Sequence, residues 1–351
     1  MNCQIGTLGI GDDFPVRVVA ELGICHRGNL ELAKEMVHWV RKSGADFVKF
    51  EAYQLDSALS KPYRAEAEIR YSTALDGEIN ANLFEAFKGG HLTFEELEEL
   101  IAEIKSLGMP FLATACSIEE ADFLISQGAC AVKLSSGEID HYPLIHHIAK
   151  QDVPLFIDTA KTYFWEIVRA YEEYLGHNGS VVVPMVNPPG YPAPSETADL
   201  RRIRALGDLF RSPIGYSCHS PGRLAVMAAI GLGARVVEKP LCPDKTQAHI
   251  EYVFSENMHE YGDFVCDVRD IDSMLGRVYR GWSTEEMKGQ LLNRHGVVAK
   301  TALSKGTRLT KHNLAIARPG LGVRPEHLES LAGRTLNRSV QEGEAIGWED
   351  V

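Results

Sequence analysis

Short apolar runs alternate with amphipathic stretches along most of the chain. Near-continuous apolar runs are typical of parallel strands that are buried on both faces of a sheet. They predict a set of strands in one parallel sheet. The runs lie at 17–21, 46–50, 110–114, 131–135, 154–158, 180–185, 213–217 and 235–239.

Helical patterns follow these runs. One predicted helix covers 29–43 and closes at Gly44, and another begins with the capping box of Thr93 and Glu96 and stops at Gly108. Alternating strands and helices indicate either a doubly wound sheet or a closed barrel, and eight units favour the (β/α)8 TIM barrel. The other helical patterns lie near 118–127, 143–150, 162–175, 197–210, 221–232 and 262–280.

Two regions depart from this alternation. Residues 53–91 form a long excursion rich in charged and aromatic residues, which we expect beside the active-site mouth because long insertions are usually functional. Beyond residue 280 the composition changes to short strands and turns. We therefore expect a barrel domain at 1–280, a linker at 281–293 and a small separate domain at 294–351.

Composition narrows the class of protein. The chain has 351 residues, of which 45% are hydrophobic and 24% charged, as in soluble globular proteins. Its seven cysteines form no CxxC pair, which favours a reducing cytoplasm. No apolar run reaches the ~18 residues of a membrane span, and the N-terminus lacks the pattern of a signal peptide. A net charge of −12 argues against nucleic acid as a partner and leaves small molecules as the expected ligands.

Every predicted strand ends in polar or charged residues. Barrel enzymes place their chemistry at the carboxyl ends of the strands, so these residues are the candidate site. For any one of them the alternative is an ordinary polar loop or a helix cap. The candidates are Glu21, Lys49, Glu51, Thr114, Lys133, Ser136, Glu138, Asp158, Lys161, Asn187, Tyr191, Ser217, His219, Glu238 and Lys239.

Lys49 and Lys133 are the most informative of these candidates. Both lie within apolar strands, where an unpaired ammonium group is costly. Together with the Ser-Ser-Gly turn at 135–137 they favour a binding site for phosphate or another anion. The alternative is a structural salt bridge with Glu21 or Glu238.

Four segments carry a resemblance to a known family. ELGICHRGNLELAKEMV, ADFVKFEAY, AVKLSSGEIDHYPLI and IGYSCHS resemble the strand-end motifs of the sialic acid (N-acetylneuraminate) synthase family, including the spore coat polysaccharide biosynthesis protein E-like members. KGTRLTKHNLAIARPGLGV resembles the C-terminal antifreeze-like domain (SAF, β-clip) of those enzymes. The resemblance covers nearly the whole chain and implies a TIM barrel followed by that small domain, which we interpret as a lid.

The resemblance also implies a reaction. The family condenses phosphoenolpyruvate with an N-acylated hexosamine to give a sialic-acid-like nonulosonic acid, here for a surface or spore coat polysaccharide. A divalent metal, Mn or Mg, acts as a Lewis acid in that reaction. His219 would ligate the metal and take part in catalysis with Glu21, which would face the new hydroxyl group. Arg318 would reach the N-acyl group from the partner subunit of a domain-swapped homodimer.

Further roles follow from the same resemblance. Phosphoenolpyruvate would be held by Lys49, Lys133, Ser136 and Ser217, with help from Thr114 and Asn187. The sugar would be contacted by Glu138 and Tyr191, and Glu51 and Glu251 lie at further substrate positions.

The chain departs from the family pattern at several of these positions. Pro240 replaces the second metal-binding histidine, and Glu51 replaces a glutamine. The STGM motif after strand five becomes Asp158, Thr159, Ala160 and Lys161. His249, Cys242 or Cys218 could supply the missing metal ligand. Alternatively, the cysteines at 25, 116, 218 and 242 are small fillers of an altered pocket.

Three hypotheses remain open. The chain is a synthase that uses a hexosamine other than N-acetylmannosamine, or a non-catalytic paralogue that binds phosphoenolpyruvate and a sugar but has lost the metal site. The third is a related synthase that makes a seven- or eight-carbon sugar acid, and the C-terminal domain argues against it.

Overall fold

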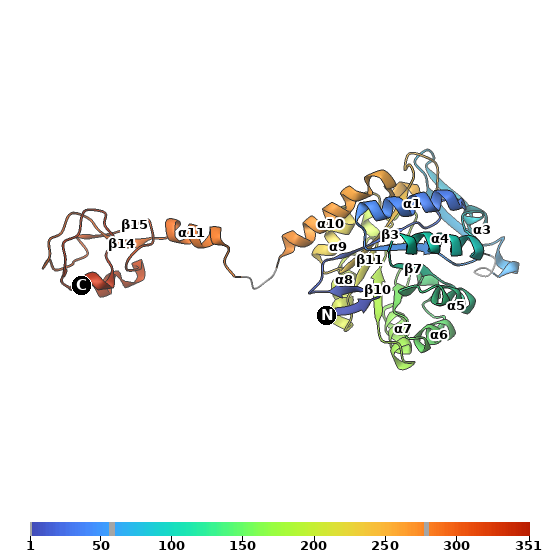
Figure 1. Ribbon diagram of the computed structural model, residues 1–351, viewed down its shortest axis with the longest axis horizontal. Coiled ribbons are helices and arrows are strands. Elements are labelled where there is room, and N and C mark those ends of the chain that lie inside the picture. The colour runs from blue at the N-terminus through green and yellow to red at the C-terminus, as the bar shows by residue number, and fades with distance from the viewer. Residues whose placement is uncertain (1, 56–59, 277–280) are drawn as a thin grey trace. The chain divides into compact units, whose positions relative to one another are not determined.

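The structure is a computed structural model that describes residues 2–55, 60–276 and 281–351. The chain divides into two compact units, Met1–Gly276 and Arg277–Val351 (Figure 1). No helix in these described ranges is both long enough and apolar enough to cross a membrane.

The first unit is a closed parallel barrel. Neighbouring strands pair in parallel, and the circle closes where the last strand pairs with the first. Each strand begins within two residues of its predicted start. The TIM-barrel prediction is therefore confirmed. The strands are β3 (Arg17–Glu21), β4 (Phe47–Glu51), β7 (Phe111–Thr114), β8 (Ala131–Leu134), β9 (Leu155–Asp158), β10 (Val182–Val186), β11 (Gly215–Ser217) and β12 (Val236–Cys242).

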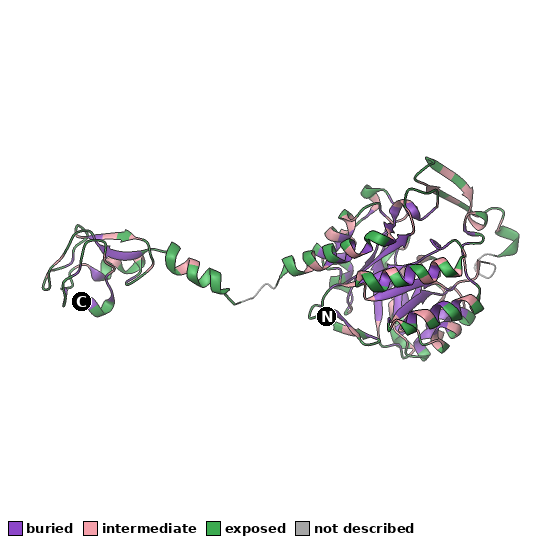
Figure 2. Cartoon of the chain, turned by 45° about the horizontal axis from the view of Figure 1, so that its top comes forward, coloured by how far each residue is buried: buried purple, intermediate pink, exposed green. Residues whose placement is uncertain are grey.

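Helices surround the barrel and bury one face each against it (Figure 2). The capping box of Thr93 and Glu96 opens α4, as predicted, and Gly44 closes α1 with a φ of 80°, which favours glycine. The helices that follow the strands are α1 (Leu30–Ser43), α4 (Phe94–Ser106), α5 (Ile118–Ser126), α6 (Tyr142–Lys150), α7 (Phe164–Gly176), α8 (Arg201–Leu209), α9 (Leu224–Gly231) and α10 (Tyr261–Leu275).

An N-terminal hairpin that the sequence pattern did not reveal covers the amino end of the barrel. Its strands β1 (Asn2–Ile5) and β2 (Leu8–Gly11) pair antiparallel. Ile5 and Ile10 are fully buried in one cluster with Val19, Phe47 and other inward-facing strand residues. The hairpin therefore seals this end with apolar side chains.

The long excursion forms a second hairpin at the other end. Strands β5 (Glu68–Ser72) and β6 (Glu78–Asn82) pair antiparallel and lead into α3 (Leu83–Phe87). The Ser72 amide donates a hydrogen bond of 3.0 Å to the carbonyl of Tyr191, in the loop after β10. This contact places the hairpin beside the carboxyl ends of the strands, where the insertion was predicted to lie.

The second unit has its own small core. Helix α11 (Thr284–Asn293) occupies the predicted linker, and β14 (Gly296–Ala299), β15 (Leu314–Ala317) and α12 (Leu328–Leu331) follow. Strands β14 and β15 pair antiparallel, and Val297, Leu309 and Ile346 are buried between the turns. The prediction of short strands and turns is confirmed, whereas the expected linker at 281–293 holds a ten-residue helix with a capping box at Ser283.

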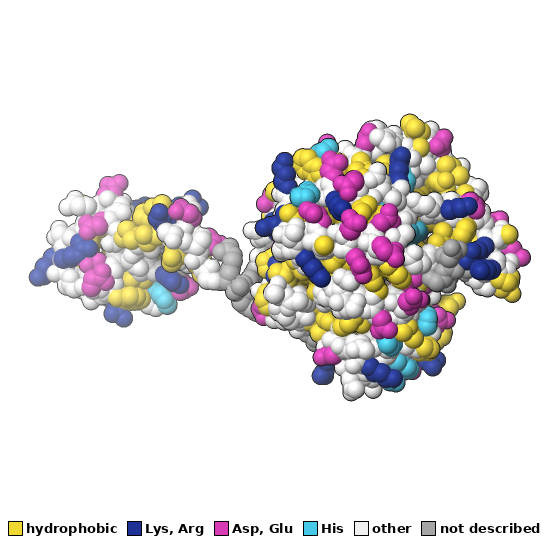
Figure 3. Space-filling model, turned by 45° about the vertical axis from the view of Figure 1, so that its right-hand side comes forward, with side chains coloured by type: hydrophobic (Ala, Val, Ile, Leu, Met, Phe, Trp, Pro, Cys, Tyr) yellow, Lys and Arg dark blue, Asp and Glu magenta, His cyan; other side chains and the backbone are white. Residues whose placement is uncertain are grey.

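Charged side chains of both signs cover the surface. On the face shown in Figure 3, acidic and basic residues are interspersed. Concentrated charge of mixed sign instead occurs inside the barrel mouth.

Candidate active site

The strand register brings the predicted site residues to one level of the barrel. Glu21 on β3 lies opposite Lys49 on β4. Glu51 lies opposite Thr114 on β7, and Thr114 lies opposite Lys133 on β8. All five side chains stand at the carboxyl ends of their strands, as expected for the active end of a barrel.

Lys49 is buried between two carboxylates. It forms ion pairs with both Glu21 and Glu51, and its side chain is only 2% exposed. Burial alone would lower the pKa of Lys49, but the attraction of Glu21 and Glu51 outweighs it and holds that pKa well above its ordinary value. The ammonium group of Lys49 therefore stays charged and neutralised.

Lys133 has an equivalent environment on the other side of β7. Its ammonium group pairs with Glu238 and, at 3.1 Å, with Asp158. Ser217 lies 3.5 Å from the same nitrogen and donates a hydrogen bond of 2.9 Å to Glu238. The sequence left open whether these lysines bind an anion or form structural salt bridges. The structure contains the salt bridges, with two carboxylates for each lysine.

The carboxylates of the mouth outnumber these two ammonium groups. Burial raises the pKa of Asp158 to about 7, although Lys133 opposes the change. Burial and the nearby Glu21 raise the pKa of Glu251 to about 8. One oxygen each of Glu51, Asp158 and Glu238 is buried without a hydrogen-bond partner in the described chain. The mouth therefore favours proton uptake when another anion enters.

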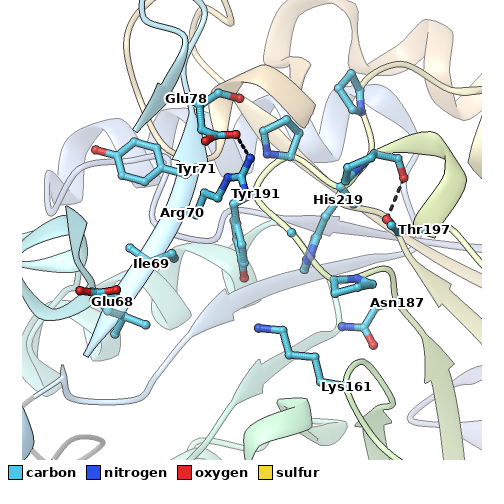
Figure 4. Close-up of a pocket in the computed structure, with 18 of the residues that line it drawn as sticks. Glu68, Ile69, Arg70, Tyr71, Glu78, Lys161, Asn187, Tyr191, Thr197 and His219 are labelled. Carbon is cyan, nitrogen blue, oxygen red and sulfur yellow. Dashed lines mark hydrogen bonds and ion pairs between the residues drawn. The ribbon is translucent and has the colours of Figure 1, made fainter. Parts of the chain in front are cut away.

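A large open cavity lies above these pairs. It has a volume of about 1570 Å³ and is lined by both strands of the β5–β6 hairpin, the Ser135–Gly137 turn and the loops after β9, β10 and β11. In Figure 4, residues of the hairpin stand on one side, and Lys161, Asn187 and His219 stand on the other. Asp158 also lines the cavity, so the Lys133 group borders it directly.

Asn187, Tyr191 and His219 shape the barrel side of this cavity. The Asn187 side-chain oxygen accepts hydrogen bonds from the amides of Thr159 (2.9 Å) and Ala160 (2.7 Å). The His219 ring lies 4.9 Å from that of Tyr191, centroid to centroid. Burial and the charge of Lys133 lower the pKa of His219 to about 3, so the imidazole is neutral at physiological pH.

The remaining predicted substrate residues lie at different places around the mouth. Ser136 lines the cavity, and the Ser135 hydroxyl donates a hydrogen bond to Glu138. Glu251 is buried and accepts a hydrogen bond of 3.0 Å from the amide of Ile24. Arg318 belongs to the second unit, where it is exposed. Its contact with the sugar stays a prediction.

The residues around His219 do not fit a divalent metal centre. Pro240, which offers no side-chain ligand, lies opposite Glu21 in the sheet. His249 instead uses Nδ1 to accept a hydrogen bond of 3.2 Å from the Glu251 amide, and its ring lies 4.3 Å from that of Tyr252. The site that the resemblance implies uses two histidines, and Pro240 leaves His219 as the one that is retained at those two positions.

Among the described residues, no cluster of three or more metal-ligating side chains includes His219. In the described ranges, the one group of three or more His, Cys, Asp or Glu ligands within 4.8 Å is His146, Glu173 and His177, on α6 and at the end of α7. Burial raises the pKa of Cys25, and raises that of Cys242 to about 12, as expected for thiols that pack as small apolar groups. The small-filler interpretation suits these two cysteines.

Two lysines changed in importance once the structure was known. Lys239 is buried, and its ammonium group donates to the carbonyls of Ser220 (2.7 Å) and Gly222 (2.9 Å), so it fixes the loop after β11. Lys161 instead lines the open cavity. Two sequence signals pointed to it: its place after the end of a predicted strand and its place in the altered strand-five motif.

Comparisons with known proteins agree with this geometry. The NeuB family model matches residues 36–280, and the SAF domain model matches residues 294–351. The chain is 31% identical to N,N'-diacetyllegionaminic acid synthase of Legionella pneumophila, over 97% of this chain and 96% of that protein. It is 28% identical to the spore coat polysaccharide biosynthesis protein SpsE of Bacillus subtilis, over 99% and 96% of the two chains.

Solved structures show the same fold. The putative spore coat polysaccharide biosynthesis protein E of Chromobacterium violaceum superposes with a TM-score of 0.76 at 24% identity, covering 95% of this chain and 98% of that chain. The family match covers most of the barrel, and the SAF match covers the second unit after α11. The chain therefore belongs to the NeuB family, with a TIM-barrel domain and a C-terminal SAF domain.

Proposed function

We propose that this chain condenses phosphoenolpyruvate with an N-acylated hexosamine to form a sialic-acid-like nonulosonic acid for a surface or spore coat polysaccharide. One observation carries the proposal: in a NeuB-family barrel, an open cavity at the carboxyl ends of the strands is lined by Ser136, Asn187, Tyr191 and His219. Relatives that match along nearly the whole chain are named as synthases of legionaminic and pseudaminic acids.

The proposed reaction forms one carbon–carbon bond. The methylene carbon of phosphoenolpyruvate attacks the aldehyde carbon of the open-chain sugar, and the aldehyde oxygen takes up a proton to become a hydroxyl group. Water adds to C2 of the donor and loses one proton. The bond between C2 and the phosphate oxygen then breaks, with its electron pair leaving on phosphate, while the C2 hydroxyl group gives up its proton and becomes the keto group. The products are a 2-keto acid and inorganic phosphate. We place Glu21 beside the new hydroxyl group.

The donor would lie over the two lysine groups. Lys49, Thr114, Lys133 and Ser217 are buried in the barrel, and Ser136 and Asn187 line the cavity. Because each lysine already has two carboxylate partners, an anionic donor enters most easily when a nearby carboxyl group is protonated. Asp158, whose pKa is raised by burial to about 7, is the group that borders the cavity.

The acceptor sugar would occupy the outer part of the cavity. We assign its contacts to Glu51, Glu138, Tyr191 and Glu251, and to Arg318 from the partner subunit of a domain-swapped homodimer. We also propose that the barrel domain spans 1–280 and that residues 281–293 connect it to the SAF domain. The proposed acceptor differs from N-acetylmannosamine, because Glu51 and the strand-five motif depart from the family pattern.

A specific observation also favours a second function. The mouth lacks a second histidine opposite Glu21, where Pro240 stands, and His219 belongs to no group of three ligands among the described residues. A paralogue that binds phosphoenolpyruvate and a sugar without turnover would have such a site.

Phosphate release distinguishes the two functions. The full-length protein is mixed with phosphoenolpyruvate and a panel of N-acylated hexosamines, with and without Mn²⁺, and inorganic phosphate is measured. We expect release that requires both substrates and that falls at least tenfold in Ser136→Ala, through loss of a hydrogen bond to a charged group. Ser126→Ala is the matched control, because Ser126 is an exposed residue of α5, and this variant should keep full activity.

Two outcomes count against synthase activity. Phosphoenolpyruvate binding without phosphate release from any sugar supports the non-catalytic paralogue. Absence of both binding and release contradicts both functions.

A further inference from the structure

Lys161 is a cationic side chain that faces the cavity. It lies in the loop after β9 and lines the cavity together with Ser135, Ser136 and Gly137. Figure 4 shows its side chain extending from that loop into the space beside Asn187 and below Tyr191. Throughout 2–55, 60–276 and 281–351, no hydrogen bond or ion pair to Lys161 is found.

The loop that presents Lys161 is held rigidly. The Asn187 side chain accepts hydrogen bonds from the Thr159 and Ala160 amides, which immediately precede Lys161. The Thr159 carbonyl in turn accepts from Arg202 at 3.1 Å and from the Thr162 hydroxyl at 2.8 Å.

The backbone of Lys161 itself is in an unusual conformation. Its φ is 55°, in the left-handed region that residues with a side chain rarely adopt. Such conformations persist where the surroundings impose them, and they cluster at ligand-binding sites. The fixed loop therefore directs this side chain into the cavity.

The other cations of the mouth already have partners. Lys49 and Lys133 each pair with two buried carboxylates, and Arg70 on the hairpin pairs with Glu78. Among the described Lys and Arg side chains that line the cavity, Lys161 is thus the one without an ion pair. Its charge is available to a ligand without breaking an existing contact.

We propose that the ammonium group of Lys161 binds the phosphate group of the donor. This inference rests on the proposed function and assigns one of its contacts. Phosphate carries more negative charge than the carboxylate of the same donor, and lysine binds it as a point charge. Ser136 lines the same cavity and can donate its hydroxyl group to another phosphate oxygen.

Direct binding to the full-length protein tests this contact. Phosphoenolpyruvate, inorganic phosphate, pyruvate and N-acetylmannosamine 6-phosphate are each titrated calorimetrically into the wild type, Lys161→Met and Lys161→Arg. We expect Lys161→Met to lower the affinity for phosphoenolpyruvate and for phosphate about 10- to 100-fold, the range for a hydrogen bond to a charged group. The affinity for pyruvate, which has no phosphate, should change less than twofold. Lys161→Arg should retain most of the affinity for phosphoenolpyruvate.

Lys105→Met provides the matched control, because Lys105 is an exposed lysine on α4. It should bind every ligand as the wild type does. If Lys161→Met binds phosphoenolpyruvate with normal affinity but no longer binds N-acetylmannosamine 6-phosphate, the lysine contacts the acceptor sugar and the inference is wrong. An unchanged affinity for all four ligands also overturns it, while the proposed function stands. If the wild type binds no phosphoenolpyruvate, both the proposed function and this inference are wrong.

Discussion

The two ends of the barrel are built from opposite chemistry. At the amino end, Ile5 and Ile10 of the β1–β2 hairpin pack against inward-facing apolar residues and exclude water. At the carboxyl end, the same barrel buries Lys49 and Lys133 with four carboxylates beneath an open cavity. Apolar burial stabilises the fold, whereas burial of ion pairs stabilises it little and costs desolvation.

The difference separates the residues that stabilise the barrel from those that we expect to bind substrate. The buried cluster at the sealed end consists of apolar side chains, which offer no charge to a ligand. The charged end holds groups with raised pKa values, and such groups concentrate at functional sites. Substitutions at the two ends should therefore separate stability from binding.

The largest effect is expected from Lys133→Met. Removing this ammonium group leaves Asp158 and Glu238 buried without their main cation. Breaking one side of a buried pair costs about 3–5 kcal/mol, so the free energy of unfolding should fall by that amount and phosphoenolpyruvate binding should be lost. Urea unfolding and calorimetric titration measure the two effects.

Lys105→Met, at the exposed site on α4, should leave both quantities unchanged. A Lys133→Met protein as stable as the wild type would show that the buried pairs are not coupled as the structure has them.

Ile5→Ala tests the apolar end. Ile5 is fully buried, and truncating such a side chain to alanine costs about 2–5 kcal/mol, so the midpoint of urea unfolding should move to lower concentration. The affinity for phosphoenolpyruvate should stay within twofold of the wild type, because the hairpin closes the far end of the barrel.

Leu75→Ala, at a side chain that is 73% exposed on the β5–β6 hairpin turn, should leave stability unaltered. Loss of ligand binding in folded Ile5→Ala would contradict the separation of the two ends.

The pH dependence of binding tests the charged end more finely. Because burial raises the pKa of Asp158 to about 7, this group is neutral below that pH and negative above it. Phosphate entry favours the neutral form, so the affinity for phosphoenolpyruvate should fall up to about tenfold for each pH unit above 7.

Asp158→Asn cannot ionise and should bind the donor about tenfold more tightly than the wild type at pH 8, with a flatter profile. Titrations at several pH values between 6.5 and 8.5 compare the two proteins. Parallel profiles would assign the pH dependence to another group.

The smallest effect is expected from removal of metal. Since Pro240 stands where the family has its second metal-binding histidine, chelation by EDTA should change the affinity for phosphoenolpyruvate less than twofold. The measurement is a titration before and after dialysis against EDTA, with the metal content determined in parallel. A tenfold loss that Mn²⁺ restores would show that a metal site forms despite Pro240.

The barrel was predictable from the sequence because its strands are buried on both faces. The runs at 131–135 and 154–158 are mostly apolar, with Lys133 as the one charged residue before the strand ends, and their positions agree closely with β8 and β9. The N-terminal hairpin escaped prediction because its strands, NCQI and LGIG, mix polar residues and glycine with the apolar ones and form no continuous apolar run.

The candidate site was predictable in its location but not in its charge state. Alternation alone places Glu21, Lys49 and Lys133 at the strand ends. It does not tell whether a lysine faces a bound anionic ligand or a carboxylate side chain of a neighbouring strand, because that depends on the strand register. Lys161 gained its importance from its loop, which is held by Asn187 and Arg202 from distant parts of the sequence.

A crystal structure of the full-length protein soaked with phosphoenolpyruvate and Mn²⁺ tests the occupancy of the barrel mouth most directly. We predict an ordered donor between Ser136 and Asn187, with its phosphate beside Lys161 and no metal ion on His219. A mouth that stays empty at saturating donor, with Lys49 and Lys133 still paired to their carboxylates, would contradict the proposed function.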